Sequence, residues 1–136
     1  MVNFYVISEY ISTSPSKGGG EKIPGGPLYD LGRIQAIARD ETGVKLFTRD
    51  CVADVGKYFG GDVEQVAGLI QLVRKTDYID SEWCDNGKGA WAACDAYSVC
   101  RKEWVPTAQK EMLMEYFLKF AINKLGTLVL TFSCHA

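Results

Sequence analysis

Two β-prone runs near the end of the chain constrain the fold more than any other feature of the sequence. Residues 117–122 and 128–132 are rich in aromatic, aliphatic and β-branched side chains, which favour strands. A short loop at residues 123–126 separates them, and Gly126 can adopt the positive φ that a tight connection needs. The pattern predicts an antiparallel hairpin that closes a sheet.

Three stretches in the first half of the chain have the apolar spacing of helices. The spacing predicts helices at about residues 29–39, 49–59 and 62–75, the second ending at the glycines 60–61. Each stretch begins at a side chain suited to capping the first turn, namely Asp30, Thr48 and Asp62.

The second half of the chain alternates as strands do, at about residues 93–104, 112–122 and 128–132. Helices first and strands last predict an α+β fold in which N-terminal helices pack on a small antiparallel β-sheet. We expect the following side chains to be buried in its core: Leu31, Ile34, Val52, Val55, Val66, Leu69, Ile70, Val73, Leu118, Phe120, Ile122, Val129 and Phe132.

The N-terminal part of the chain differs in composition from the rest. Residues 1–10 are β-prone and can add a strand, whereas residues 11–27 are rich in Ser, Pro, Lys and Gly and predict a flexible linker. A length of 136 residues suits one domain. We therefore divide the chain into an N-terminal extension (1–28) and a folded domain (29–136).

Charge and cysteine content exclude several kinds of protein. A net charge of −2 argues against a nucleic-acid binder with a broad basic surface. There is one histidine and no C-x-x-C motif, so we expect no structural metal and no cofactor. No apolar run approaches the roughly 18 residues that span a membrane, and the N-terminus has no signal-peptide pattern, which indicates a cytoplasmic protein with reduced, mostly buried cysteines.

Basic, aromatic and histidine side chains are frequent after the third expected helix. On one face of a sheet, such groups can cleave RNA without a metal: a base takes the 2′-OH proton, cations stabilise the phosphorane, and an acid protonates the leaving oxygen. The plainer interpretation is a solvated sheet face, which carries the same residue types. The residues concerned are Arg74, Lys75, Tyr78, Tyr97, Arg101, Lys102, Tyr116, Lys119 and His135.

The order of several motifs resembles the MqsR family of toxins. The resemblance covers about residues 29–136 and rests on the segments Tyr29–Ile34, Thr48–Asp50, Val73–Thr76, Trp91–Tyr97 and the two closing strands. It implies a ribosome-independent mRNA endonuclease with a RelE/YoeB-like α+β fold. It also implies an antitoxin partner that neutralises the toxin.

The resemblance also assigns site residues. The catalytic lysine of the family falls on Lys75, and the aspartate and tyrosine of its Trp-Gln-Asp-Val-Tyr motif fall on Asp95 and Tyr97. Three positions depart from the family, because Cys94, Phe117 and Ser133 stand where it has a glutamine, a tyrosine and a lysine.

Nearby residues are candidates to replace the missing groups. Tyr116 is adjacent to Phe117, and His135 lies two residues beyond Ser133, on the same face of a strand. We therefore expect a catalytic set of Lys75, Tyr97, Tyr116 and His135, and RNA-binding side chains at Arg74, Arg101 and Lys119.

These observations predict the toxin of a type II toxin–antitoxin system, a metal-independent mRNA endoribonuclease. The expected partners are mRNA and a cognate antitoxin protein, without a membrane or a metal. One alternative is a catalytically inactive binding or regulatory protein of the same fold. A third interpretation is an unrelated small α+β domain with a small-molecule pocket.

Overall fold

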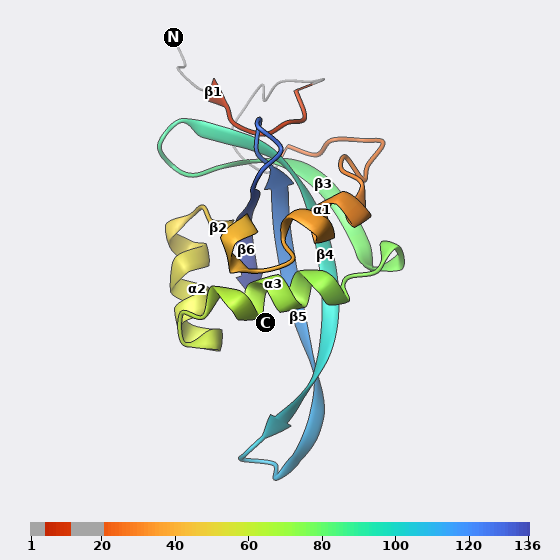
Figure 1. The fold of residues 1–136 in the computed structure, drawn as a ribbon, viewed down its shortest axis with the longest axis vertical. Helices are drawn as coiled ribbons and strands as arrows, with labels where there is room; N and C mark the ends of the chain where they lie inside the picture. The colour runs from red at the N-terminus through yellow and green to blue at the C-terminus, as the bar shows by residue number, and fades with distance from the viewer. Residues whose placement is uncertain (1–4, 12–20) are drawn as a thin grey trace.

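The computed structural model of the protein describes residues 5–11 and 21–136, which form a single mixed β-sheet with α-helices in front of it (Figure 1). The strand order is β1-β4-β5-β6-β2, and β3 also pairs with β4. The strands are β1 (Tyr5–Val6), β2 (Val44–Leu46), β3 (Tyr78–Asp85), β4 (Ala90–Val105), β5 (Lys110–Ile122) and β6 (Val129–His135). The helices are α1 (Leu31–Ile37), α2 (Arg49–Phe59) and α3 (Val63–Leu72), with 3-10 turns η1 (Glu41–Gly43) and η2 (Lys75–Asp77).

The predicted fold class, N-terminal helices on a small antiparallel sheet, is wrong. The sheet has six strands and is the largest part of the described structure, and its two shortest strands pair in parallel: β1 with β4, and β2 with β6. The helices are not an N-terminal block either, since β1 precedes them and β2 lies between α1 and α2. Val44 pairs with Val129, so this pairing joins segments that are far apart in sequence and leaves no local pattern.

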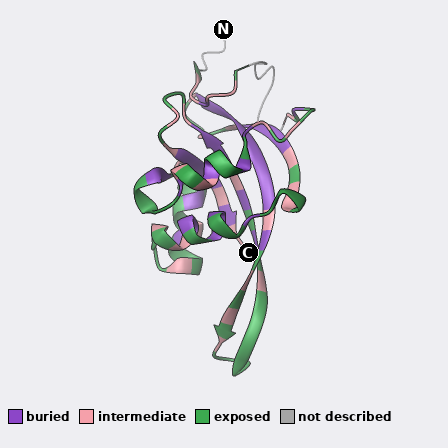
Figure 2. Cartoon of the chain, turned by 45° about the vertical axis from the view of Figure 1, so that its right-hand side comes forward, coloured by how far each residue is buried: buried purple, intermediate pink, exposed green. Residues whose placement is uncertain are grey.

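The two longest strands, β4 and β5, extend beyond the rest of the molecule. They pair from Asp95 and Phe120 to Val105 and Lys110, and the distal half of this pair projects as an exposed two-stranded ribbon (Figures 1 and 2). The proximal half is buried and packs in the body of the sheet. The β4–β5 pair therefore has two parts: a solvated ribbon at its distal end and a buried part that belongs to the core of the sheet.

The predicted capping residues are confirmed. The Asp30 carboxylate accepts from the Arg33 N–H, the Thr48 hydroxyl accepts from the Cys51 N–H, and the Asp62 carboxylate accepts from the Glu64 N–H. Each bond satisfies an amide that the first turn of a helix leaves unpaired. The boundaries are tighter than expected, because α1 spans seven residues and α3 ends at Leu72.

The main core lies between the helices and the facing side of the sheet. All the side chains expected there are buried except Val52, which is 53% exposed. Helix α2 turns Cys51 and Val55 toward the sheet, so the adjacent Val52 points to solvent. A smaller cluster of Ile23, Trp83, Trp91 and Ala93 lies apart from the main core.

The segment predicted as a flexible linker is ordered in its last part. The Ile23 N–H donates to the Ser81 carbonyl, the Trp83 N–H donates to the Glu21 carbonyl, and the Ile23 side chain is buried. Residues 21–23 of the predicted linker therefore pair with β3, while its residues 12–20 lie outside the described part of the chain. Within the described residues, every helix is too short or too polar to cross a membrane.

Candidate functional site

One face of the sheet, which we call the open face, turns away from the main core. Two rows of paired residues define it: Lys119 pairs with Ser133, and Phe117 pairs with His135. Phe117 is 39% exposed, whereas its neighbour Leu118 points the other way and is buried in the main core. The first row continues across β4 to Asp80 on β3.

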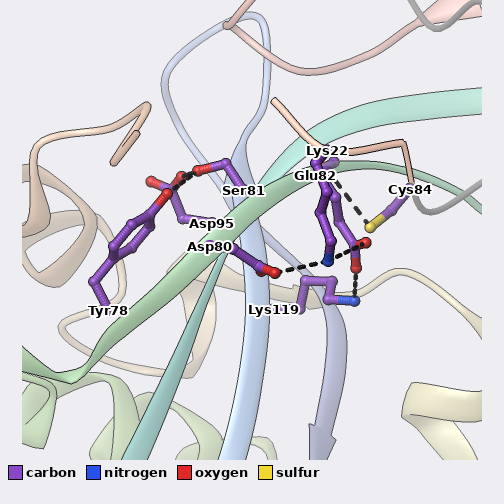
Figure 3. Close-up of polar contacts among 8 residues, drawn as sticks. All are labelled: Lys22, Tyr78, Asp80, Ser81, Glu82, Cys84, Asp95 and Lys119. Atoms are coloured by element: carbon purple, nitrogen blue, oxygen red, sulfur yellow. Dashed lines mark hydrogen bonds and ion pairs between the residues drawn. The ribbon is translucent and has the colours of Figure 1, made fainter. Parts of the chain in front are cut away.

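A network of alternating charges lies on the open face (Figure 3). Glu82 on β3 forms ion pairs with Lys119 on β5 and with Lys22, whose Nζ is 3.1 Å from a Glu82 carboxylate oxygen. The Nζ of Lys22 also lies 2.6 Å from a carboxylate oxygen of Asp80. Lys22 itself reaches this position because it forms a β-bridge with Glu82.

This network fixes the ionisation of its central groups. Burial raises the pKa of Glu82, but the hydrogen bonds from Lys119 and Lys22 outweigh it and hold the pKa below its ordinary value. Burial lowers the pKa of Lys119, but its hydrogen bond to Glu82 and the nearby thiols raise it above the ordinary value. Both groups are therefore charged at neutral pH.

A pocket of about 330 Å³, which we call the sheet-face pocket, opens beside this network. In the lining of this pocket, the His135 and Phe117 rings are tilted against each other, with 5.9 Å between the ring centroids. The Nδ1 atom of His135 is 3.1 Å from the Ala136 carbonyl oxygen. The charged and aromatic side chains in the lining of this pocket include Lys22, Asp80, Glu82, Phe117, Lys119 and His135.

A second pocket, the adjoining pocket, shares Glu82, Lys119 and Ser133 with the first and has a volume of about 470 Å³. Its far wall is the N-terminal turn of α2, with Arg49 exposed there. The two pockets therefore lie next to each other on the open face, with the Glu82–Lys119 ion pair on the boundary that they share.

Of the predicted site residues, the structure brings Lys119 and His135 together in the sheet-face pocket. Lys75 lies elsewhere: it is exposed in η2 and lines a separate pocket with Asp30 and Tyr78. Tyr97 borders the Lys75 pocket and the sheet-face pocket. Its side chain is only 1% exposed, and its ring stacks on Phe120. Burial raises the pKa of Tyr97, so its phenol stays protonated.

Tyr116 and Arg101 lie on the opposite side of the sheet, under the helices. The Tyr116 hydroxyl donates to Glu103 at 2.7 Å, and the Tyr116 ring packs on Phe59. Burial and the Glu103 carboxylate raise the pKa of Tyr116 to about 12. Arg101 pairs with the same Glu103 and donates to the Gln65 side-chain oxygen. These residues are part of the packing between sheet and helices, and Tyr116 does not replace Phe117 on the open face.

Arg74 also lies away from the sheet-face pocket. Its guanidinium pairs with Asp77 at 3.2 Å in η2, and its side chain is 76% exposed. The site residues predicted from the sequence therefore lie in three places: on the open face, on the opposite face under the helices, and at η2.

Asp95, the aspartate that matches the family motif, is buried in the fold and does not line the sheet-face pocket. The Asp95 carboxylate is fully buried and accepts hydrogen bonds from the Leu28 and Tyr29 N–H groups and, at 2.6 Å, from the Ser81 hydroxyl (Figure 3). Burial raises the pKa of Asp95, and these hydrogen bonds compensate only partly. Asp95 thus anchors the segment that leads into α1.

Three residues of the charge network, Lys22, Asp80 and Glu82, are absent from the set predicted from the sequence. Asp80 and Glu82 alternate with the buried Ser81 and Trp83, which is the period-two pattern of a strand with one polar face. That signal was present in the sequence. Lys22 left none, because a lysine in a glycine-rich segment is ordinary.

The three positions that depart from the family pattern share the open face. Ser133 and Phe117 line the sheet-face pocket, and Cys94 pairs with Glu82 in the strand next to it. No family model matches the chain, and neither a curated protein nor a solved structure matches it. The MqsR resemblance therefore stays a prediction.

Proposed function

We propose that the protein is a metal-independent endoribonuclease that cleaves single-stranded mRNA at the sheet-face pocket. One observation carries the proposal: a single pocket collects a histidine, two lysines, two carboxylates and an exposed phenylalanine. These residue types supply an acid, a base, cations for the phosphate and a surface for a base to stack on.

We assign the roles within this pocket from the exposure and charge of its side chains. Asp80 is the base that takes the proton of the ribose 2′-OH, since its side chain is 36% exposed, whereas that of Glu82 is 10% exposed and held by two lysines. The 2′-oxygen then attacks phosphorus. Lys119 and Lys22 stabilise the phosphorane charge.

His135 completes the reaction. Histidine is the side chain that both gives and takes a proton near neutral pH. Its proton goes to the departing 5′-oxygen, so the products are a 2′,3′-cyclic phosphate and a 5′-hydroxyl. Phe117, in contact with the His135 ring, offers a face on which a nucleotide base stacks.

The family resemblance extends the proposal to the biological context. The protein acts as the toxin of a toxin–antitoxin system, works in the cytoplasm and is neutralised by a cognate antitoxin protein. Growth arrest on expression, relieved by the product of a neighbouring gene, tests this part separately from the chemistry.

The second candidate is a catalytically inactive binding or regulatory protein that uses the same open face. The ion pairs favour it, because Lys22 and Lys119 are already neutralised by Asp80 and Glu82, and a phosphate must displace these carboxylates. Both candidates use the open face and work in the cytoplasm. RNA cleavage is therefore the property that distinguishes the ribonuclease from the binding protein.

The test is incubation of purified, antitoxin-free protein with single-stranded RNA in EDTA. The control substrate has the same sequence with 2′-O-methyl groups, which removes the nucleophile. The ribonuclease proposal predicts cleavage of the RNA alone, with cyclic phosphate ends. Intact RNA in the presence of folded protein supports the binding protein instead.

A further inference from the structure

Two cysteines lie side by side on the open face, one on each of two neighbouring strands. Cys84 on β3 pairs with Ala92, and Cys94 on β4 pairs with Glu82, so the two cysteines are diagonal neighbours on one face. The Cys84 Sγ lies 3.9 Å from the Glu82 carbonyl, and the Cys94 Sγ lies 3.7 Å from the Ala92 carbonyl. Each sulfur thus leans along its strand toward the row of the other.

The two thiols differ in access. Cys84 lines the adjoining pocket and is partly exposed, whereas Cys94 is fully buried behind it. Lys119, which lines the same pocket, acts electrostatically on both sulfurs.

The other thiols of the described residues lack this arrangement. Cys100 is exposed on the projecting ribbon, and Cys51 and Cys134 are buried in the main core, where burial raises the pKa of each to about 12. A small oxidant therefore reaches one paired thiol, Cys84, without any opening of the fold.

We propose that Cys84 and Cys94 form a redox-active pair in which a hydroperoxide oxidises Cys84 and Cys94 completes a disulfide. The Cys84 sulfur attacks one peroxide oxygen and becomes a sulfenic acid, with loss of water when the oxidant is hydrogen peroxide. The Cys94 sulfur then attacks the Cys84 sulfur, and the hydroxyl leaves with the thiol proton as a second water. Each disulfide consumes one peroxide, and two electrons pass from the two sulfurs to it.

The difference in burial assigns this order. Burial and the neighbouring Cys84 thiol raise the pKa of Cys94, which keeps it a protonated thiol until its neighbour is oxidised. Cys84 meets the oxidant first because it borders the pocket. This chemistry does not depend on RNA cleavage.

The experiment uses the full chain with Cys100→Ser, which removes the exposed thiol that lies in the same tryptic peptide as Cys94. The protein is treated with hydrogen peroxide, free thiols are alkylated, and trypsin cuts at Lys88, between the two cysteines. We expect a disulfide-linked pair of peptides containing Cys84 and Cys94, which dithiothreitol separates.

Two further variants make the result specific. Cys94→Ser is expected to stop at the Cys84 sulfenic acid, which dimedone traps, and Cys84→Ser is expected to leave Cys94 reduced. Circular dichroism confirms that each variant is folded. Oxidation of Cys84 to sulfinic acid with Cys94 still reduced overturns the proposal, as does a Cys51–Cys134 link that forms equally fast.

Discussion

Lys119 on β5 and Glu82 on β3 form an ion pair that crosses the intervening strand β4. Lys22 joins the same carboxylate from a segment that pairs with β3. Three strands and the N-terminal part of the chain thus meet at one carboxylate, and the sheet-face pocket opens beside it. The arrangement couples the stability of this region to the charges that the proposed reaction uses.

The two lysines are expected to differ in their contribution to stability. Lys119→Met leaves a mostly buried Glu82 carboxylate with one exposed partner, and we expect the free energy of unfolding to fall by about 3 kcal/mol. Lys22→Met removes a lysine whose side chain is 63% exposed, and we expect a loss below about 1 kcal/mol. Urea unfolding of both variants checks the difference, and equal losses would contradict the assigned burial.

Glu82 is expected to make stability fall in acid. Because its folded-state pKa lies below the ordinary value of 4.5, its contribution is present above that pH and is lost as the pH falls through the folded-state pKa. The difference in unfolding free energy between wild type and Glu82→Gln should therefore shrink as the pH falls below 4.5 and through the folded-state pKa. A difference that grows on acidification argues against the ion pairs.

Asp95 is expected to act in the opposite direction. Its pKa is raised above 3.8, so this group favours the folded state most below that pH, and the contribution is lost as the pH rises through the folded-state pKa. At neutral pH its hydrogen bonds still hold the chain before α1. Asp95→Ala should cost about 3 kcal/mol and speed hydrogen exchange at the Leu28 and Tyr29 amides.

The matched control for Asp95 is the capping residue Asp30. Asp30→Ala removes one exposed hydrogen bond to the Arg33 N–H and should cost about 1 kcal/mol without exposing Leu28. Faster exchange at Leu28 in both variants to the same degree refutes the anchoring role of Asp95.

Two glycines are expected to respond oppositely to alanine. A Cβ at Gly43 meets the Ile37 carbonyl oxygen at 1.7 Å, so Gly43→Ala has to displace backbone and should destabilise the protein by more than about 2 kcal/mol. A Cβ at Gly56, inside α2, meets nothing within 4 Å. Gly56→Ala should stabilise by about 0.5–1 kcal/mol, the helix propensity difference, and thermal unfolding of the two variants measures both effects.

The features that the sequence predicts well are local ones. Thr48 and Asp62 cap helices because a side-chain oxygen two or three residues before an amide is sufficient for the bond. The buried set on β5 follows from strict alternation at Leu118 and Phe120. Such patterns need no knowledge of the rest of the chain.

The features that it misses depend on contacts between distant segments. The parallel pairing of Val44 with Val129 sets the sheet type, and the bridge between Lys22 and Glu82 sets the charge network. Tyr116 lies away from the sheet-face pocket for a different reason. It is adjacent to Phe117 in β5, so its side chain points to the opposite face of the sheet, where its ring packs on Phe59.

The most direct test of the proposed function is the RNA cleavage rate of His135→Ala, measured beside Lys110→Ala on the exposed ribbon as the control. Loss of a general acid should lower the rate about 10²- to 10⁴-fold without changing the melting temperature, and the control should cleave as the wild type does. His135→Ala protein that cleaves RNA at the wild-type rate would contradict the assignment of the reaction to the sheet-face pocket.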